Sequence, residues 1–125
     1  MANSSKISES EWKIMKLLWK KSPQPAYDLS QELEISDEMN SQVVKTLLNR
    51  LVKKKVLGYQ TYKNLYLYFP KVREEDCIQQ ESESFLNQIF DGSWASMVVH
   101  FAQNRKLSKQ EIEDLKRIIR EQESK

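Results

Sequence analysis

Cationic side chains are concentrated in one stretch of this sequence. No Asp or Glu lies between Glu38 and Glu74, whereas the same stretch holds Lys45, Arg50, Lys53, Lys54, Lys55, Lys63, Lys71 and Arg73. Such a run creates a positive potential that attracts a phosphate backbone. A solvated amphipathic helix is the alternative, but it would tolerate charges of both signs. The absence of acids therefore favours nucleic-acid binding.

Residues 40–54 have the pattern of a helix with two different faces. Apolar side chains recur three and four positions apart on one face, at Val44, Leu47, Leu48, Leu51 and Val52. Hydrogen-bonding and basic side chains fall mostly on the other face, at Gln42, Lys45, Thr46, Asn49, Arg50 and Lys53. Asn40 is a suitable N-cap. We predict a helix up to about Lys54, with one face in the core and the other available to bind DNA.

After Gly58 the period of the apolar pattern changes from 3.6 to two, which is typical of strands. The alternating sets are Leu57, Tyr59 and Thr61 in the first run, and Leu65, Leu67 and Phe69 in the second, with Tyr66 and Tyr68 opposite. A turn is expected at residues 62–64, and Pro70 ends the second strand. The pattern predicts a β-hairpin directly after the basic helix.

Two further helices are expected before the basic one. Ser8 and Glu11 form a capping box that starts a helix at Glu9, which continues to about Lys20. The prolines at 23 and 25 then break the chain, and a second helix is predicted over residues 26–34. Three helices followed by a hairpin is the order of a winged helix-turn-helix domain, in which the third helix enters the major groove.

The C-terminal part is predicted to be entirely helical. Helices are expected over residues 74–90, from Trp94 to about Gln103, and after a second capping box at Ser108 and Glu111. The last helix carries an apolar stripe that needs a partner, either the first seventy residues or a second copy of the chain. Candidates for a dimer interface are Phe85, Ile89, Trp94, Phe101, Ile112, Leu115, Ile118 and Ile119.

Charge and chain order favour the second copy. Residues 1–70 hold eleven Lys or Arg and seven Asp or Glu, whereas residues 71–125 hold nine and eleven. The sequence therefore predicts a mainly α fold with a small β-hairpin. It would consist of a winged helix-turn-helix DNA-binding domain at 1–70 and a helical dimerisation domain at 71–125.

Residues for catalysis or metal binding are scarce. The chain has one histidine, His100, and one cysteine, Cys77, and these are far apart in sequence. Nucleophilic catalysis needs a positioned base beside the nucleophile, and a zinc site needs clustered ligands. We expect no catalytic residues, no metal and no cofactor. The chain also lacks a signal-peptide core and an apolar run of membrane-spanning length, so we expect a cytoplasmic protein without membrane insertion.

Motifs from both ends of the chain resemble the penicillinase and methicillin-resistance repressor family. They are Ile7-Ser8-x-x-Glu11-Trp12-x-Ile14-Met15-x-x-Leu18-Trp19, the run from Val44 to Lys54, Tyr66-x-Tyr68-x-Pro70, Glu81-Ser82-x-Ser84-Phe85-Leu86, and Leu107-Ser108-x-x-Glu111-Ile112-x-x-Leu115. The resemblance implies a bacterial winged-helix repressor. It would be a homodimer held by its C-terminal helices and bound to a palindromic double-stranded operator, often controlling resistance or copper-handling genes.

In that family the start of the third helix and the wing contact the operator. Carried onto this chain, and combined with the basic face, the resemblance gives the DNA-binding candidates Gln42, Val43, Lys45, Thr46, Asn49, Arg50, Lys53, Lys54 and Lys63. The family typically has Trp-Ser-Pro-Lys-Thr leading into this helix, whereas this chain has Met39-Asn40-Ser41-Gln42-Val43. A different operator sequence is therefore expected.

Release from DNA has several routes in this family. The copper-responsive branch carries a C-terminal cysteine pair that is missing here, which excludes that route. The branch released by proteolysis, in a membrane sensor pathway, is cut at an Asn-Phe bond, and the corresponding bond here is His100-Phe101. Ligand release, constitutive binding and oxidation of Cys77 are the alternatives, and oxidation is the least favoured because the acidic neighbours of Cys77 would raise the pKa of its thiol. A winged-helix module for protein interaction, or an RNA-binding module, remains the competing class.

Overall fold

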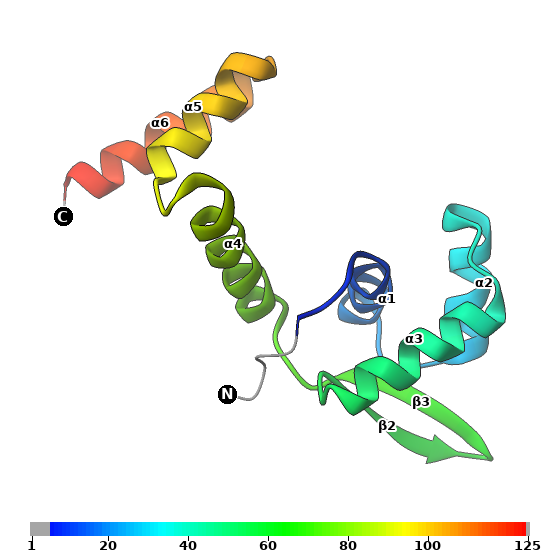
Figure 1. Cartoon of the computed structure of the whole chain (residues 1–125). Coiled ribbons are helices and arrows are strands. Elements are labelled where there is room, and N and C mark those ends of the chain that lie inside the picture. The colour runs from blue at the N-terminus through cyan, green and yellow to red at the C-terminus, as the bar shows by residue number, and fades with distance from the viewer. Residues whose placement is uncertain (1–5, 125) are drawn as a thin grey trace. The chain divides into compact units, whose positions relative to one another are not determined.

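The computed structural model describes residues 6–124. The chain forms two compact units, Met1–Glu81 and Ser82–Lys125, and helix α4 (Glu74–Phe90) begins in the first unit and continues into the second. Most of the chain is helical and the strands form one small antiparallel sheet (Figure 1). This confirms the predicted mainly α fold with a winged helix-turn-helix element order.

Helix α1 (Glu9–Lys20) packs against α3 and β3 in the first unit. Ser8 and Glu11 form the predicted capping box at its start. Its inward face is apolar, so Ile14, Met15 and Leu18 are completely buried. The Nε1 of Trp19 donates a hydrogen bond to the carbonyl of Val72 at 3.0 Å, which ties the segment before α4 to this helix.

Helices α2 (Ala26–Asp37) and α3 (Ser41–Lys53) form the helix-turn-helix. α2 is three residues longer than the predicted helix, and its C-cap is Glu38, whose backbone is left-handed with φ 57°. Asn40 caps α3, because its side chain accepts a hydrogen bond from the Val43 amide at 2.9 Å. The predicted apolar face of α3 is buried, at Val44, Leu47, Leu48 and Leu51.

Strands β2 (Leu57–Tyr62) and β3 (Leu65–Pro70) form the hairpin, here called the wing. Tyr62 pairs with Leu65, so the turn has two residues and not the predicted three. Lys63 and Asn64 both have positive φ, as a tight two-residue hairpin turn requires. A short strand that the sequence does not predict, β1 (Gln24–Pro25), pairs with β3 and gives the strand order β1-β3-β2.

The second unit consists of the later part of α4 with helices α5 (Trp94–Asn104) and α6 (Lys109–Glu123). Gly92, with φ 80°, follows the end of α4 in the left-handed conformation that favours glycine. Ser93 caps α5, and Ser108 with Glu111 forms the predicted capping box of α6. None of the described residues of this unit is buried, which sets it apart from the first unit.

Candidate nucleic-acid interface

The outward face of α3 presents most of the predicted DNA-binding side chains. Because the apolar face is packed in the core, the polar face points to solvent. The exposed candidates on this helix are Gln42, Val43, Lys45, Thr46, Asn49, Arg50 and Lys53. The structure therefore brings these predicted residues together on one surface. They offer amide, hydroxyl, guanidinium and ammonium groups of the kinds that read base edges in the major groove.

Two details refine this face. The hydroxyl of Thr46 donates to the carbonyl of Gln42 at 3.0 Å, so its proton is already engaged and its oxygen remains an acceptor. Val43 is 41% exposed in the first turn of the helix, where a branched apolar group suits contact with a thymine methyl. The face thus combines polar readout groups with a small apolar spot.

The turn of the wing places Lys63 at the tip of the hairpin. Its Nζ lies 5.3 Å from the centre of the Tyr62 ring, a cation–π distance. Farther along the wing, the exposed rings of Tyr59 and Tyr66 are stacked with their centroids 4.4 Å apart. This ring pair links β2 and β3 on the hairpin that carries Lys63. The alternation of the sequence predicts strands here, but it does not reveal this diagonal ring pair.

The electrostatics of the surface follow from the missing acids. Among residues 6–124, the ion pairs found in the structure leave Lys45, Arg50, Lys53 and Lys63 without an acidic partner. Their charge is therefore not neutralised within the protein and can act on a phosphate backbone.

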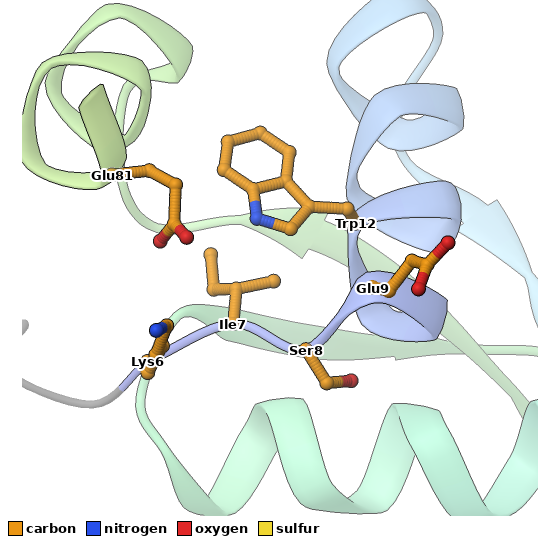
Figure 2. A pocket seen from close by; sticks show the side chains of 6 residues that line it. All are labelled: Lys6, Ile7, Ser8, Glu9, Trp12 and Glu81. Atoms are coloured by element: carbon orange, nitrogen blue, oxygen red, sulfur yellow. The ribbon is translucent and has the colours of Figure 1, made fainter. Parts of the chain in front are cut away.

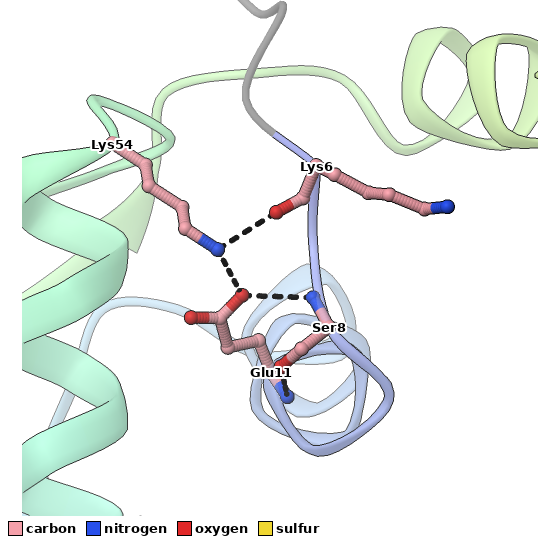
Figure 3. Close-up of polar contacts among 4 residues, drawn as sticks. All are labelled: Lys6, Ser8, Glu11 and Lys54. Carbon is pink, nitrogen blue, oxygen red and sulfur yellow. Dashed lines mark hydrogen bonds and ion pairs between the residues drawn. The ribbon is translucent and has the colours of Figure 1, made fainter.

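Lys54 behaves differently from the other predicted cations. Its Nζ lies 2.6 Å from Oε1 of Glu11 and donates to the carbonyl of Lys6 at 2.7 Å (Figure 3). Glu11 is only 1% exposed, and its carboxylate also accepts the amide of Ser8. Lys54 is thus the least available of the predicted phosphate contacts, because its ammonium is already bound within the protein.

The predicted dimer residues of the second unit are mostly exposed. Exposed fractions are 43% for Phe85, 56% for Ile89, 49% for Trp94, 45% for Phe101, 38% for Ile112, 40% for Ile118 and 44% for Ile119, while Leu115 is half-buried. Trp94, Ile118 and Ile119 line one hollow together with Gln122 and Glu123. The unit therefore has an apolar surface that its own helices do not cover.

The candidate cleavage bond lies inside a helix. His100 and Phe101 are exposed residues of α5, and the ring of Phe90 lies 5.8 Å from the His100 ring and 6.3 Å from the Phe101 ring. The carbonyl of His100 accepts a hydrogen bond from the Asn104 side chain at 2.8 Å. A protease would have to unwind this turn of α5 before it could cut the bond.

Cys77 and a pocket beside α1 do not involve the exposed face of α3. Cys77 is buried, and burial raises the pKa of its thiol, as do the nearby charges of Asp76 and Glu74. A pocket of the first unit lies beside α1, where Trp12 and Glu81 face each other above Ile7 (Figure 2). Within residues 6–124 no three His, Cys, Asp or Glu side chains could jointly hold a metal ion. No described helix is long and apolar enough to cross a bilayer.

The fold and the exposed face of α3 define a winged helix-turn-helix protein of the DNA-binding class. A sequence profile described as penicillinase repressor matches residues 7–121. The chain belongs to this penicillinase repressor family, and the predicted resemblance is confirmed. It is therefore a transcriptional repressor and not an enzyme.

Individual relatives agree along nearly the whole chain. The penicillinase repressor of Staphylococcus aureus is 32% identical over 120 residues, which covers 95% of both chains. That of Bacillus licheniformis is 33% identical over 125 residues, covering 100% of this chain and 98% of the relative. The methicillin resistance regulatory protein MecI of Staphylococcus aureus is 29% identical over 113 residues, or 90% of this chain and 92% of MecI.

Solved structures of a repressor are similar to part of this chain. The DNA-binding domain of the repressor BlaI aligns with a TM-score of 0.53 and 28% identity, covering 61% of this chain and 90% of that domain. The monomeric form of Bacillus licheniformis BlaI in complex with the blaP half-operator aligns with a TM-score of 0.52 and 29% identity, covering 58% of this chain and 88% of that one.

Proposed function

We propose that the chain is a homodimeric repressor that binds a palindromic operator through α3 and the wing. The observation that carries this proposal is the exposed, acid-free surface of α3 in a fold that matches a repressor domain bound to a half-operator. In this proposal α3 lies in the major groove and the wing lies along the backbone. Residues 1–70 bind the DNA and residues 71–125 hold the dimer.

Each side chain has a role that follows from its chemistry. Lys45, Thr46 and Arg50 read base edges, with Arg50 suited to a bidentate contact with guanine. Gln42, Val43 and Asn49 share this readout surface, and Val43 and Gln42 stand where the family pattern differs. Lys53 and Lys63 bind phosphates, which fix the register of the protein on the duplex.

The dimer is supported by the surface of α6. Ile112, Ile118 and Ile119 are each at least 38% exposed on an amphipathic helix. Burying an apolar side chain of this size contributes roughly 1.5 to 3 kcal/mol. A second copy that covers this stripe therefore gives a stable pair, and its two α3 helices read half-sites about one helical turn, or a multiple of it, apart.

For release from DNA we place proteolysis at His100-Phe101 first, by family resemblance. Cutting α5 would separate α6 from the rest of the chain, and loss of the second DNA contact can lower operator affinity by about 100-fold through effective concentration alone. Release by a ligand and constitutive binding follow. Oxidation of Cys77 is last, because its buried thiol has a raised pKa and so little reactive thiolate.

A repressor acts in the compartment that holds the DNA, so we propose a cytoplasmic protein.

Its regulated genes would be resistance genes like those named in its relatives, and its inducing signal would come from a membrane sensor protease. A full-length protein in induced cells would rule out the proteolytic route.

Footprinting of the purified protein on its own upstream region tests the proposal. We expect a protected palindrome, and Arg50→Ala should weaken binding to it by about 1 to 3 kcal/mol without changing binding to random DNA. Lys53→Ala is the matched control, which should weaken both and lower the dependence on salt. An unprotected region with no shift at low salt would contradict DNA binding and leave the protein-interaction or RNA-binding class.

A further inference from the structure

Glu11 is an acidic side chain at an unusual place. It lies in the first turn of α1, is 1% exposed, and faces the end of α3. A carboxylate is costly to bury unless a cation and hydrogen bonds compensate it. Lys54 supplies the cation, with its Nζ 2.6 Å from the carboxylate (Figure 3). The two residues are 43 positions apart in sequence, so their ion pair joins the start of α1 to the end of α3.

Lys54 occupies the point at which α3 changes into the wing. It is the C-cap of α3, and the helix closes by hydrogen bonds from the Lys55 amide to Val52 and from the Val56 amide to Leu51. These bonds have the pattern of a Schellman motif, with Lys55 in the left-handed conformation at φ 68°. The next residue, Leu57, begins β2.

The end of β3 is bonded to the same segment between α3 and β2. The amide of Lys71 donates to the carbonyl of Val56 at 2.9 Å, directly after β3 ends. The position of the wing relative to α3 therefore depends on a junction of three residues, 54–56. One of the three has a backbone conformation that is unfavourable for a lysine.

We propose that Glu11 is a positioning residue for DNA binding, because its ion pair with Lys54 fixes the junction between α3 and the wing against α1. This inference rests on the proposed function. Lys54 then supports specificity as an anchor inside the protein and makes no phosphate contact. The other ion pairs of α1, from Lys13 to Asp37 and from Lys16 to Glu74, join partly exposed side chains and do not touch this junction.

Removing the charge of Glu11 should change DNA affinity in the direction opposite to the one expected from net charge alone. Glu11→Gln keeps the capping box, because glutamine also serves at this position, but it removes the ion pair. It also removes a negative charge and frees the ammonium of Lys54, which by charge alone would tighten DNA binding. If Glu11 positions the junction between α3 and the wing, Glu11→Gln should instead bind the operator more weakly. Glu9→Gln is the matched control, since Glu9 is an exposed acid in the same helical turn.

The test uses the full-length protein and a duplex that the wild type selects from a random-sequence pool. Affinities are measured on this duplex and on an unrelated one over a series of salt concentrations. Glu11→Gln and Lys54→Met should each lose about tenfold on the selected duplex, the order of one misplaced base contact. Neither should lose affinity on the unrelated duplex, and the salt dependence should not change.

The controls should behave differently. Lys54→Arg keeps the ion pair and should retain full affinity, whereas Lys53→Ala should lower the salt dependence by about one phosphate contact. Glu11→Gln binding as tightly as Glu9→Gln, or Lys54→Met lowering the salt dependence as Lys53→Ala does, would overturn the inference. If Glu11→Gln does not fold, the double variant with Lys54→Met leaves no buried charge, and the same loss of specificity is expected.

A second readout separates this inference from the proposed function. If the wild type selects no duplex, the proposed function fails and the DNA-positioning role fails with it. Hydrogen exchange of the Lys55 and Val56 amides does not involve DNA. These amides should exchange faster in Glu11→Gln than in Glu9→Gln, and equal rates would show that the ion pair does not hold the junction.

Discussion

The two units of this chain differ in how they satisfy their apolar side chains. In the first unit a core of buried residues joins all three helices and the wing, with members such as Ile14, Leu29, Leu48, Leu57 and Tyr68. In the second unit none of the described residues is buried, although α6 is amphipathic and several large apolar side chains are more than 40% exposed. One unit completes its core within the chain, and the other does not.

This difference indicates that the two units have different roles, DNA binding and dimerisation. A unit with its own core can present a rigid DNA-binding surface, since its side chains have fixed positions. A unit whose apolar faces stay uncovered can gain stability from association, because contiguous exposed apolar surface commonly marks an interaction site. The first unit would therefore be a DNA-binding body, and the second a dimerisation element whose structure depends on its partner.

The largest expected effect comes from breaking the core of the first unit. Leu48→Ala removes a completely buried side chain from α3 and should lower the free energy of unfolding by about 2 to 5 kcal/mol. Urea unfolding followed by circular dichroism measures this loss. It should not depend on protein concentration, because this core lies within one chain.

Ile119→Ala is the counterpart in the second unit. This side chain is 44% exposed within the chain, so the substitution should raise the dissociation constant of the dimer. It should lower the midpoint of thermal unfolding at concentrations where the wild type is a dimer, and this loss should vanish in samples too dilute for either protein to dimerise. If Ile119→Ala destabilised the protein equally at all concentrations, α6 would be packed within its own chain and the contrast between the units would fail.

Low pH should affect the first unit more than the second, because Glu11 is buried whereas Glu111, which has the same place in the capping box of α6, is exposed. Burial raises the pKa of the Glu11 carboxyl, but hydrogen bonds from Lys54 and Ser8 and the charge of Lys54 together lower it more, so its pKa lies below the ordinary value of 4.5. A carboxyl with a lowered pKa in the folded state stabilises the protein above the ordinary value. That stability is lost as the pH falls through the folded value.

Urea unfolding of the wild type and Glu11→Gln between pH 7 and pH 3 measures this effect. The wild type should be more stable by a constant amount at neutral pH, and the difference should shrink as the pH falls below 4.5. A difference that stays constant over the whole range would show that the charge of Glu11 does not contribute.

A smaller effect is expected at the junction between α3 and the wing. Lys55 has φ 68°, a conformation that glycine adopts without strain, so Lys55→Gly should stabilise the first unit by roughly 0.5 to 1 kcal/mol. Lys55→Ala is the control, because it removes the charge but keeps the strained backbone. Equal stabilities of the two variants would mean that the strain is relieved in another way.

Local signals in the sequence explain why much of the fold could be predicted. Capping boxes at Ser8 and Ser108 and the N-cap at Asn40 mark helix starts, because the capping side chains bond to amides two or three residues away. The face of α3 follows from the helical period. Such signals depend only on near neighbours, so a single sequence is sufficient to read them.

The features that could not be predicted depend on distant partners. β1 is a strand only because β3 lies beside it, and nothing in Gln24–Pro25 by itself indicates a strand. The burial of Glu11 and the binding of Lys54 depend on how α1 packs against α3. From sequence alone Lys54 is one cation among several in a basic run, and its different role becomes visible only in the folded structure.

The most direct test of this account is sedimentation velocity of the full chain and of a fragment that ends at Glu81, the last residue of the first compact unit. We expect a dimer for the full chain at micromolar concentration and a folded monomer for the fragment. A monomeric full chain, or a fragment that forms a stable dimer, would contradict the assignment of dimerisation to the second unit.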